Sequence, residues 1–312
     1  MVPDNNYGSS IPQEVVQQMQ KTILDFQQRY KDGYIGRQLI EQRPGVAPYV
    51  RKDIVRHIDK TTPQDGISAA RISLGGTSPN LVSNKAKDKA FSIYRIDAAI
   101  MRNEDEVALD PSLWNRDTSL AMMDCIRREN YTIINGDSTL GITGLVGASA
   151  ANSLGSIVAS GGDGSSTINN NGAWAGTETD KVMDPYDDFR AALNFIDPDL
   201  VGTLYAAGRP AYMNYLLQED DLGKIFADKI GPRIFGRPAG DNSWIVKSDY
   251  FPANYVYLIM KSMEAAELLI PEDYNVDSNY PREKGQNIYA EIGGWIGIEI
   301  HNNDFIVPIA IN

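Results

Sequence analysis

The sequence has one cysteine and two histidines among its 312 residues. Cys125 cannot form an intramolecular disulfide, and we interpret it as a small buried apolar residue rather than a nucleophile. His57 and His301 are far apart in the chain, and together with one cysteine they cannot build a thiolate zinc site. No motif supports a Cys-His or Ser-His catalytic arrangement. The sequence therefore predicts no catalytic, metal-binding or cofactor-binding residues.

Long apolar runs and an excess of positive charge are also missing. No run could cross a bilayer, and the first residues have neither the basic nor the apolar part of a secretory signal. The formal charge of −12 disfavours binding to bulk nucleic acid or to an anionic membrane. Two short basic clusters are interpreted as solvated strand or loop faces: Arg51, Lys52, Arg56 and Lys60, then Lys85, Lys87 and Lys89.

A long helix after Asp110-Pro111 is the feature around which we expect the chain to be organised. An aspartate can cap free backbone N–H groups, and proline at the first helical position gives up a donor that has no partner there. Neither glycine nor proline occurs from Ser112 to Ile134. Apolar residues do not follow one stripe, which predicts packing on several sides. Asn135-Gly136-Asp137 should end the helix, followed by a tight loop that contains Gly141 and Gly144.

The N-terminal part predicts an amphipathic helix and then an extended arm. Residues 12–30 place apolar side chains at helical spacing. This stripe could dock on the protein's own core or on a partner: Val15, Met19, Ile23, Phe26 and Tyr30. Arg37–Ile40 is predicted to begin an extended segment. Residues 51–90 are predicted to form a two-stranded excursion, with Arg71–Leu74 as a strand. Because an isolated hairpin is marginal in water, such an arm would be mobile or laid across a neighbouring subunit.

Several acidic and glycine-rich stretches resemble functional motifs only in part. Phe91–Ile100 is predicted to be a strand, and the acidic turn Glu104–Glu106 after it is interpreted as a solvated loop rather than a metal site. The loop Gly161–Gly164 lacks the GK[ST] sequence of a phosphate-binding loop. Asp187 and Asp188 follow Asp184-Pro185 in the first turn of a predicted helix, where the helix dipole favours acids. A hydrolase that uses these three aspartates is the catalytic alternative, and it requires them to converge in a pocket.

The second half predicts an α+β domain. A helix is expected near Pro210–Leu217, and a turn-rich segment follows over residues 230–243. Helices against a mostly antiparallel sheet would result. The expected strands are Ser243–Lys247, Tyr255–Met260, Ala265–Ile270, Asn287–Ile300 and Phe305–Ile311.

The order of these parts resembles the HK97-like superfamily of shell proteins, which contains the major capsid proteins of tailed viruses and the encapsulins. The resemblance covers nearly the whole chain. It rests on an N-terminal helix before Gly36-Arg37-Gln38-Leu39, a long hairpin, a strand, an acidic turn, and a long helix that ends in N-G-D-x-x-x-G-I-x-G-L over Asn135–Leu145. The Gly/Ser/Asn-rich insert between Ala148 and Gly176 is longer than expected for a compact encapsulin, whereas the N-terminal helix and Gly36-Arg37 look more encapsulin-like.

The resemblance implies an α+β HK97-like capsid fold. It implies an N-terminal helix and arm over residues 1–50, and an extended E-loop hairpin with flanking strands over 51–100, its loop at Thr61–Lys89. It further implies a spine helix and turn of the peripheral domain over 101–147, and an axial mixed α/β domain with return strands to the peripheral domain over 148–312.

The implied function is a structural, non-enzymatic subunit without a cofactor. Many copies would self-assemble, as pentamers alone or as pentamers and hexamers, into an icosahedral shell. The preferred reading is a viral major capsid protein that encloses the genome in the virion capsid. The alternative is an encapsulin in a cytoplasmic nanocompartment, where a groove lined by Val15, Met19, Ile23 and Phe26 would receive the peptide of a cargo enzyme.

Overall fold

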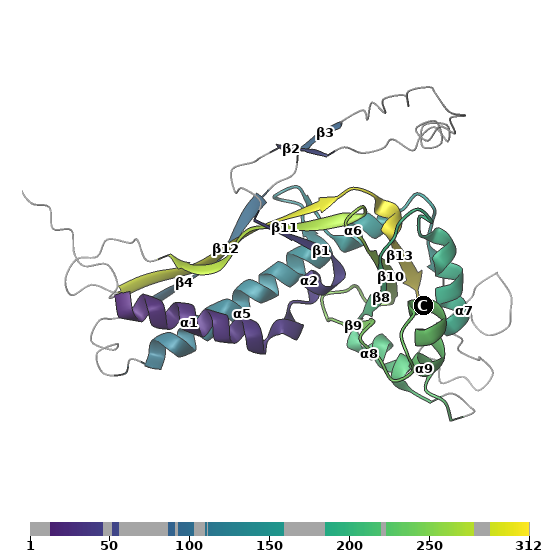
Figure 1. The fold of residues 1–312 in the computed structure, drawn as a ribbon, viewed down its shortest axis with the longest axis horizontal. Helices are drawn as coiled ribbons and strands as arrows, with labels where there is room; N and C mark the ends of the chain where they lie inside the picture. The colour runs from purple at the N-terminus through teal and green to yellow at the C-terminus, as the bar shows by residue number, and fades with distance from the viewer. Residues whose placement is uncertain are drawn as a thin grey trace, which may run out of the picture.

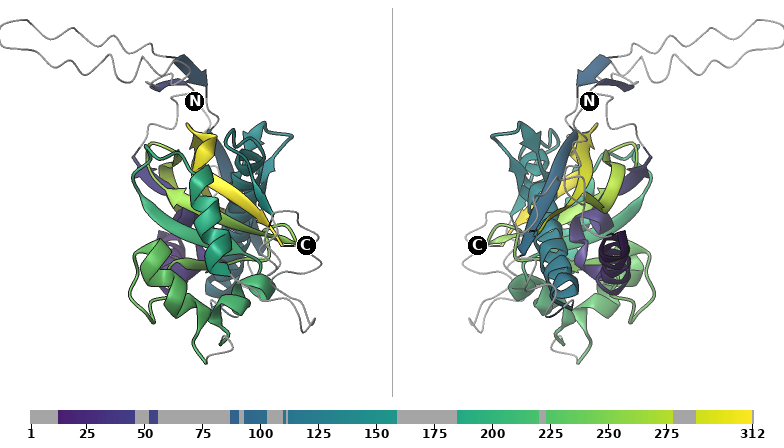
Figure 2. Two further views of the ribbon diagram at one scale, coloured as in Figure 1. Left: turned by 90° about the vertical axis from the view of Figure 1, so that its right-hand side faces the viewer. Right: turned by 90° about the vertical axis from the view of Figure 1, so that its left-hand side faces the viewer.

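The structure is a computed structural model. It describes residues 13–45, 52–55, 87–90, 93–102, 110, 112–158, 185–219, 223–277 and 288–311. Within these residues the fold contains two larger sheets and two short two-stranded ladders. Figures 1 and 2 show an elongated molecule, with one large sheet and two long helices at one end and the second sheet with several short helices at the other.

The first sheet has the strand order β1-β11-β12-β4. Strands β11 and β12 run antiparallel, β12 and β4 run antiparallel, and β1 pairs in parallel with β11. The register of β11 shifts between Leu269 and Glu272 and again before Asn275. Such bulges increase the local twist of a strand. The bounds are β1 Glu41–Pro44, β4 Ile93–Arg102, β11 Ala266–Asp277 and β12 Ile288–Ile300.

Two helices cover one face of this sheet, as Figure 1 shows: α1, Gln13–Arg29, and α5, Ser112–Asn135. The predicted cap of α5 is confirmed, because Oδ1 of Asp110 accepts from the backbone N–H of Ser112 at 3.0 Å. The apolar stripe of α1 is buried in the protein's own core. It packs with the sheet and with one face of α5 through Met19, Ile23, Phe26, Trp114, Met122, Cys125, Ile126, Ala290, Ile292 and Ile296.

Helix α5 differs from its prediction in how it is packed. Buried residues follow one stripe through most of the helix, and Leu120 remains 53% exposed. The polar residues Thr118 and Glu129 lie in the buried stripe, so apolar residues alone did not reveal it. Packing on several sides holds only for the last turn, where Thr132, Ile133 and Ile134 are all buried.

The turn after α5 has the predicted stop at Gly136, whose φ is +79°. The short strands β5, Gly136–Asp137, and β6, Ile142–Thr143, pair antiparallel, and α6, Leu145–Ala150, follows. A Cβ at position 144 would clash with the backbone of Gly136 and would lie 2.7 Å from the carbonyl oxygen of Ile134, so only glycine fits there. The glycine-pinned loop predicted from the sequence is therefore confirmed.

The second sheet has the strand order β7-β13-β10-β8-β9. Its inner strands β13, β10 and β8 are antiparallel, whereas β7 and β9 pair in parallel at the two edges. Of the five expected strands, β9, β10 and β13 lie in this sheet and β11 and β12 lie in the first. The expected antiparallel pairing holds for β10 with β13 and for β11 with β12, whereas β9 pairs in parallel. The bounds are β7 Ile157–Val158, β8 Thr203–Gly208, β9 Ile245–Lys247, β10 Tyr255–Lys261 and β13 Ile306–Ala310.

Short helices pack beside this sheet around Phe189 and Trp244, two fully buried side chains. The helices predicted after Asp184 and near Pro210 are present as α7, Pro185–Ala192, with η2, Leu193–Phe195, and as α8, Pro210–Met213, with η3, Asn214–Leu217.

Two local predictions were wrong, at least in part, and one strand was missed. Arg37–Leu39 belongs to the helix α2, Ile35–Leu39, which follows η1, Lys31–Gly33. The turn-rich segment is in part helical, with α9, Phe226–Ile230, running into a π-helical turn, η4, Gly231–Phe235. Strand β8 was not predicted at all. In each case tertiary packing supports a short element whose local sequence signal is weak.

The predicted two-stranded excursion lies largely outside the described residues. Its base is described: β2, Lys52–Val55, pairs antiparallel with β3, Lys87–Ala90. This pair lies apart from the first sheet in Figure 1. The predicted strand Arg71–Leu74 and the acidic turn Glu104–Glu106 are not among the described residues.

Candidate functional site

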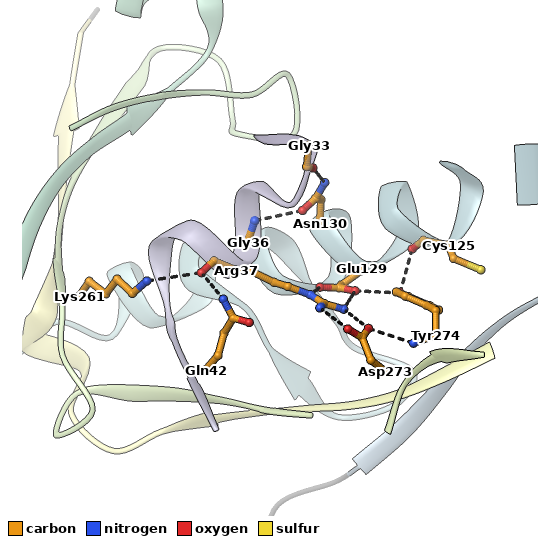
Figure 3. Close-up of polar contacts among 10 residues, drawn as sticks. All are labelled: Gly33, Gly36, Arg37, Gln42, Cys125, Glu129, Asn130, Lys261, Asp273 and Tyr274. Carbon is orange, nitrogen blue, oxygen red and sulfur yellow. Dashed lines mark hydrogen bonds and ion pairs between the residues drawn. The ribbon is translucent and has the colours of Figure 1, made fainter. Parts of the chain in front are cut away.

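A connected polar cluster joins α2 to α5 and β11 (Figure 3). We call it the Arg37 cluster, and it consists of Arg37, Glu129, Asp273 and Tyr274. Nε of Arg37 lies 2.6 Å from Oε1 of Glu129, and Nη2 lies 3.0 Å from Oε2. Asp273 accepts from the same guanidinium at 3.0 and 3.2 Å. One arginine thus binds two carboxylates in the fork geometry that favours strong, directional pairs.

Each member of the cluster comes from a different element. Arg37 lies on α2, Glu129 on α5, and Asp273 and Tyr274 on β11. A second contact fixes α2 against α5. The side chain of Asn130 accepts from the backbone N–H of Gly36 at 3.0 Å and donates to the carbonyl of Gly33 at 2.7 Å. The segment from Gly33 to Arg37 is therefore held to α5 by two neighbouring residues of that helix, Glu129 and Asn130.

Burial decides the electrostatics of the Arg37 cluster. The side chain of Glu129 is fully buried and that of Arg37 is 10% exposed, whereas Asp273 is 48% exposed. Burial by itself lowers the pKa of Arg37, but its hydrogen bonds to Glu129 and Asp273 outweigh burial and raise it. Burial, together with the neighbouring Glu129 charge, raises the pKa of Tyr274. Arginine and tyrosine therefore keep their protons at every physiological pH.

Aromatic rings complete the enclosure of the guanidinium. The Arg37 Cζ atom lies 4.3 Å from the ring centroid of Tyr34 and 5.8 Å from that of Tyr274. The Tyr274 hydroxyl donates to Oε2 of Glu129 at 2.8 Å. The Arg37 cluster thus joins α2, α5 and β11 through directional bonds to one guanidinium, an arrangement that suits holding three elements in one geometry.

A groove of about 810 Å³ lies beside the Arg37 cluster, between the N-terminal arm and the edge strand β9. Its lining is mixed in charge and includes Lys31, Asp32, Tyr205, Lys247 and Lys261. A smaller pocket of about 380 Å³ lies between β4 and α5, lined in part by Asp97, Asp124 and Arg128. Burial and a hydrogen bond to Glu291 raise the pKa of Asp97.

The acids of the catalytic alternative do not meet in either of these cavities. Asp187 is exposed and Asp188 is buried, both in the first turn of α7, and neither lines the groove or the smaller pocket. Asp184 is not among the described residues. The two described aspartates lie where the helix dipole favours them, as the sequence indicated.

The remaining candidates are placed as follows. Cys125 is buried, and burial raises the pKa of its thiol to about 12, which agrees with an apolar rather than a nucleophilic role.

The described members of the two basic clusters lie on strands, as predicted: Lys52 in β2, and Lys87 and Lys89 in β3. His301 lies beside two buried glutamates. Several candidates lie outside the described residues: His57, Arg51, Arg56, Lys60, Lys85 and Gly161–Gly164.

Arg37 belongs to the Gly36-Arg37-Gln38-Leu39 motif found in the sequence, but its partners in the cluster were not predicted. A signal for Glu129 was present. It follows Met122, Cys125 and Ile126 at the helical spacing of the buried stripe. A carboxylate at such a position requires a cation or several donors nearby. No comparable signal marks Asp273, which is 236 residues from Arg37 in the chain.

No family model and no curated protein matches this sequence. Solved structures do match it in fold. A virus-like particle protein from Pyrococcus furiosus is 13% identical with a TM-score of 0.57, over 95% of this chain and 99% of that one. The capsid of an empty GTA particle, computed with C5 symmetry, is 13% identical with a TM-score of 0.54, over 89% and 90%. A chain from Microbacterium phage Oxtober96 is 12% identical with a TM-score of 0.53, over 86% and 88%.

These likenesses extend along nearly the full length of both partners in each comparison. The chain therefore has the HK97-like shell fold, and the α+β class predicted from the sequence is confirmed. The described helices include none that combines the length and apolar character needed to cross a membrane.

Proposed function

We propose that this chain is a structural subunit that assembles with many copies of itself into a closed icosahedral shell, as a viral major capsid protein that encloses a genome. The observation that carries the proposal is the fold, shared over 89% of the chain with the capsid of an empty GTA particle. The Arg37 cluster supports a structural role, because its hydrogen bonds hold α2, α5 and β11 together.

The division into parts belongs to the same proposal. Residues 1–50 would form the N-terminal helix and arm, 51–100 the E-loop hairpin with its flanking strands, 101–147 the spine helix and turn, and 148–312 the axial domain with return strands. The antiparallel pairing of β2 with β3 supports a hairpin, since such a pair is what the base of a hairpin requires.

One expectation of the nanocompartment alternative, a groove for a cargo peptide along α1, is not met. The groove that would receive a cargo peptide was expected along Val15, Met19, Ile23 and Phe26, but the last three are buried against α5 and the first sheet. These side chains are therefore core residues of the subunit. The virion capsid is the location we propose on this basis.

The test is the assembly state of the purified full chain. We expect sedimentation velocity and electron microscopy to show closed particles with icosahedral symmetry. Stable monomers or dimers at all salt and protein concentrations, with no particles on the grids, would contradict the proposal. Particles isolated from the natural source distinguish the two readings, because a capsid would contain nuclease-protected genome and a nanocompartment would contain a cargo protein.

A further inference from the structure

Two neighbouring connections join the two large sheets. Strand β10 of the second sheet leads through residues 262–265 into β11 of the first sheet. Strand β12 of the first sheet leads through residues 301–305, which contain η5, Asn303–Phe305, into β13 of the second sheet. The carbonyl of Ala265 accepts from the backbone N–H of His301 at 2.8 Å and from that of Asn302 at 3.1 Å. The two connections are thus hydrogen-bonded to each other, and His301 is held at the joint.

Two glutamates and His301 lie together at this joint. Glu267 and Glu299 are direct partners across β11 and β12, so their side chains lie on the same face of the sheet. Nδ1 of His301 lies 3.6 Å from Oε1 of Glu299, and Nε2 lies 3.9 Å from Oε2 of Glu267. One donor atom from each of the three residues falls within 4.8 Å of the others. The exposed fractions of the side chains are 11%, 1% and 10% for Glu267, Glu299 and His301.

The geometry points to a binding site for a divalent transition-metal ion formed by Glu267, Glu299 and His301. Only one ring nitrogen of His301 can bind a given ion, so the relevant measure is the set of three donor atoms, one from each residue, that lie within 4.8 Å of one another. Ligands at about 2.1 Å from a metal lie roughly 3 to 4 Å from one another, so the three donors are close enough to close around one ion with small side-chain shifts. A neutral imidazole with two carboxylates suits zinc, manganese, iron or cobalt, whereas magnesium and calcium prefer oxygen ligands alone.

Charge supports the same assignment. Like charges directly opposite each other on paired strands repel, and burial increases the free-energy cost of two carboxylates. Arg43 donates to Oε2 of Glu267 at 3.3 Å, but its own side chain is 47% exposed. A carboxylate can accept from this guanidinium and still bind an ion, because it has about four lone-pair sites. A bound cation would oppose the charge of Glu299, which is the most deeply buried of the three.

A metal ion here would link the start of β11 to the end of β12, where the chain passes from one sheet to the other. It would therefore stabilise the end of the first sheet from which both connections leave. The inference does not depend on the proposed shell function, because metal binding is measured on the subunit whether or not particles form.

The test is calorimetric titration of the purified, metal-free full chain with Zn²⁺ and, separately, with Mn²⁺. We expect one ion per chain in the wild type. Glu299→Gln and His301→Asn should each weaken binding at least about tenfold, since each removes a direct ligand. Two controls should bind like the wild type: Glu264→Gln, an exposed glutamate of the same connection, and His57→Asn, which removes the other histidine.

A second measurement needs no variant and guards against substitutions that unfold the protein. Co²⁺ added to the wild type should give visible d–d absorption bands that Zn²⁺ abolishes. Absence of one-to-one binding in the wild type, absence of the cobalt bands, or unchanged affinity in His301→Asn would each overturn the assignment. An effect of His57→Asn equal to that of His301→Asn would do so as well.

Discussion

At the scale of single residues, the protein depends on a buried charge that has a fixed set of partners. Glu129 is fully buried and faces a guanidinium that is nearly as buried. Two ions taken out of water are stable only where geometry and further hydrogen bonds compensate for lost hydration. Arg37 supplies two bonds to this carboxylate and the Tyr274 hydroxyl a third. Removing one partner of Glu129 should therefore lower the free energy of unfolding more than removing an exposed ion pair would.

We expect Glu129→Gln to lower the free energy of unfolding by about 3 kcal/mol, because the buried guanidinium then loses its main counter-charge. The measurement is denaturant unfolding followed by circular dichroism. Asp124→Asn is the matched control, since Asp124 lies on the same helix, pairs with Arg127, and is 70% exposed. The control should stay within about 0.5 kcal/mol of the wild type. Equal stability of the two variants would contradict this account of the Arg37 cluster.

At the scale of elements, α5 contributes to two of the buried clusters and so connects the first sheet to the second. Its first turns pack against α1 and the first sheet, through Trp114 and Met122. Its last turn packs in a second cluster, where Ile133 and Ile134 meet residues of α2, α6 and both sheets. The helix α2 comes close enough to α5 that a Cβ on Gly36 would lie 2.9 Å from the Cβ of Ile133. Glycine is therefore required at position 36 by the packing of the two helices.

Gly36→Ala should lower the free energy of unfolding by about 1 to 3 kcal/mol, because an added methyl group overpacks the contact between α2 and α5. Gly33→Ala provides the comparison, since a Cβ there would approach Cβ of Tyr30 at an ordinary 3.8 Å. Thermal and denaturant unfolding of the two variants decide the matter. A Gly36→Ala protein as stable as Gly33→Ala would show that the helices can separate at little cost.

At the scale of the whole molecule, the proposed function depends on contacts between copies. The second sheet and its helices have their own core around Phe189 and Trp244. The first sheet, α1 and α5 have another. The pair of β2 and β3 belongs to neither of the two large sheets and lies apart from the first sheet in Figure 1. The segment closed by that pair is the part whose loss should affect assembly more than folding.

Deletion of Pro63–Asn84 should therefore leave a folded subunit that does not form shells. Far-UV circular dichroism and the unfolding midpoint should stay near those of the full chain, and sedimentation should show only small species. Particles of wild-type size from the deleted protein would refute the role we assign to this segment. An unfolded product would refute the claim that the body is stable without it.

Local signals explain most of what the sequence determined. The bounds of α1 and α5 follow from amphipathic spacing, an Asp-Pro start and a glycine stop, all of which act within a few residues. The β10, β12 and β13 segments were likewise found from short apolar runs. The α+β class and the HK97-like order of parts followed from the sequence of these elements along the chain.

Tertiary structure decided the rest, because it depends on residues that meet only after folding. Arg37 binds Glu129, which is 92 residues away in the sequence, and Asp273, which is 236 residues away. The short helix α2 is stabilised by the side chain of Asn130, which accepts a hydrogen bond from the backbone N–H of Gly36 in the first turn. Likewise, the sequence marks Glu267, Glu299 and His301 as ordinary polar residues. Only the pairing of β11 with β12 and the joint between the two sheets bring their side chains to one point.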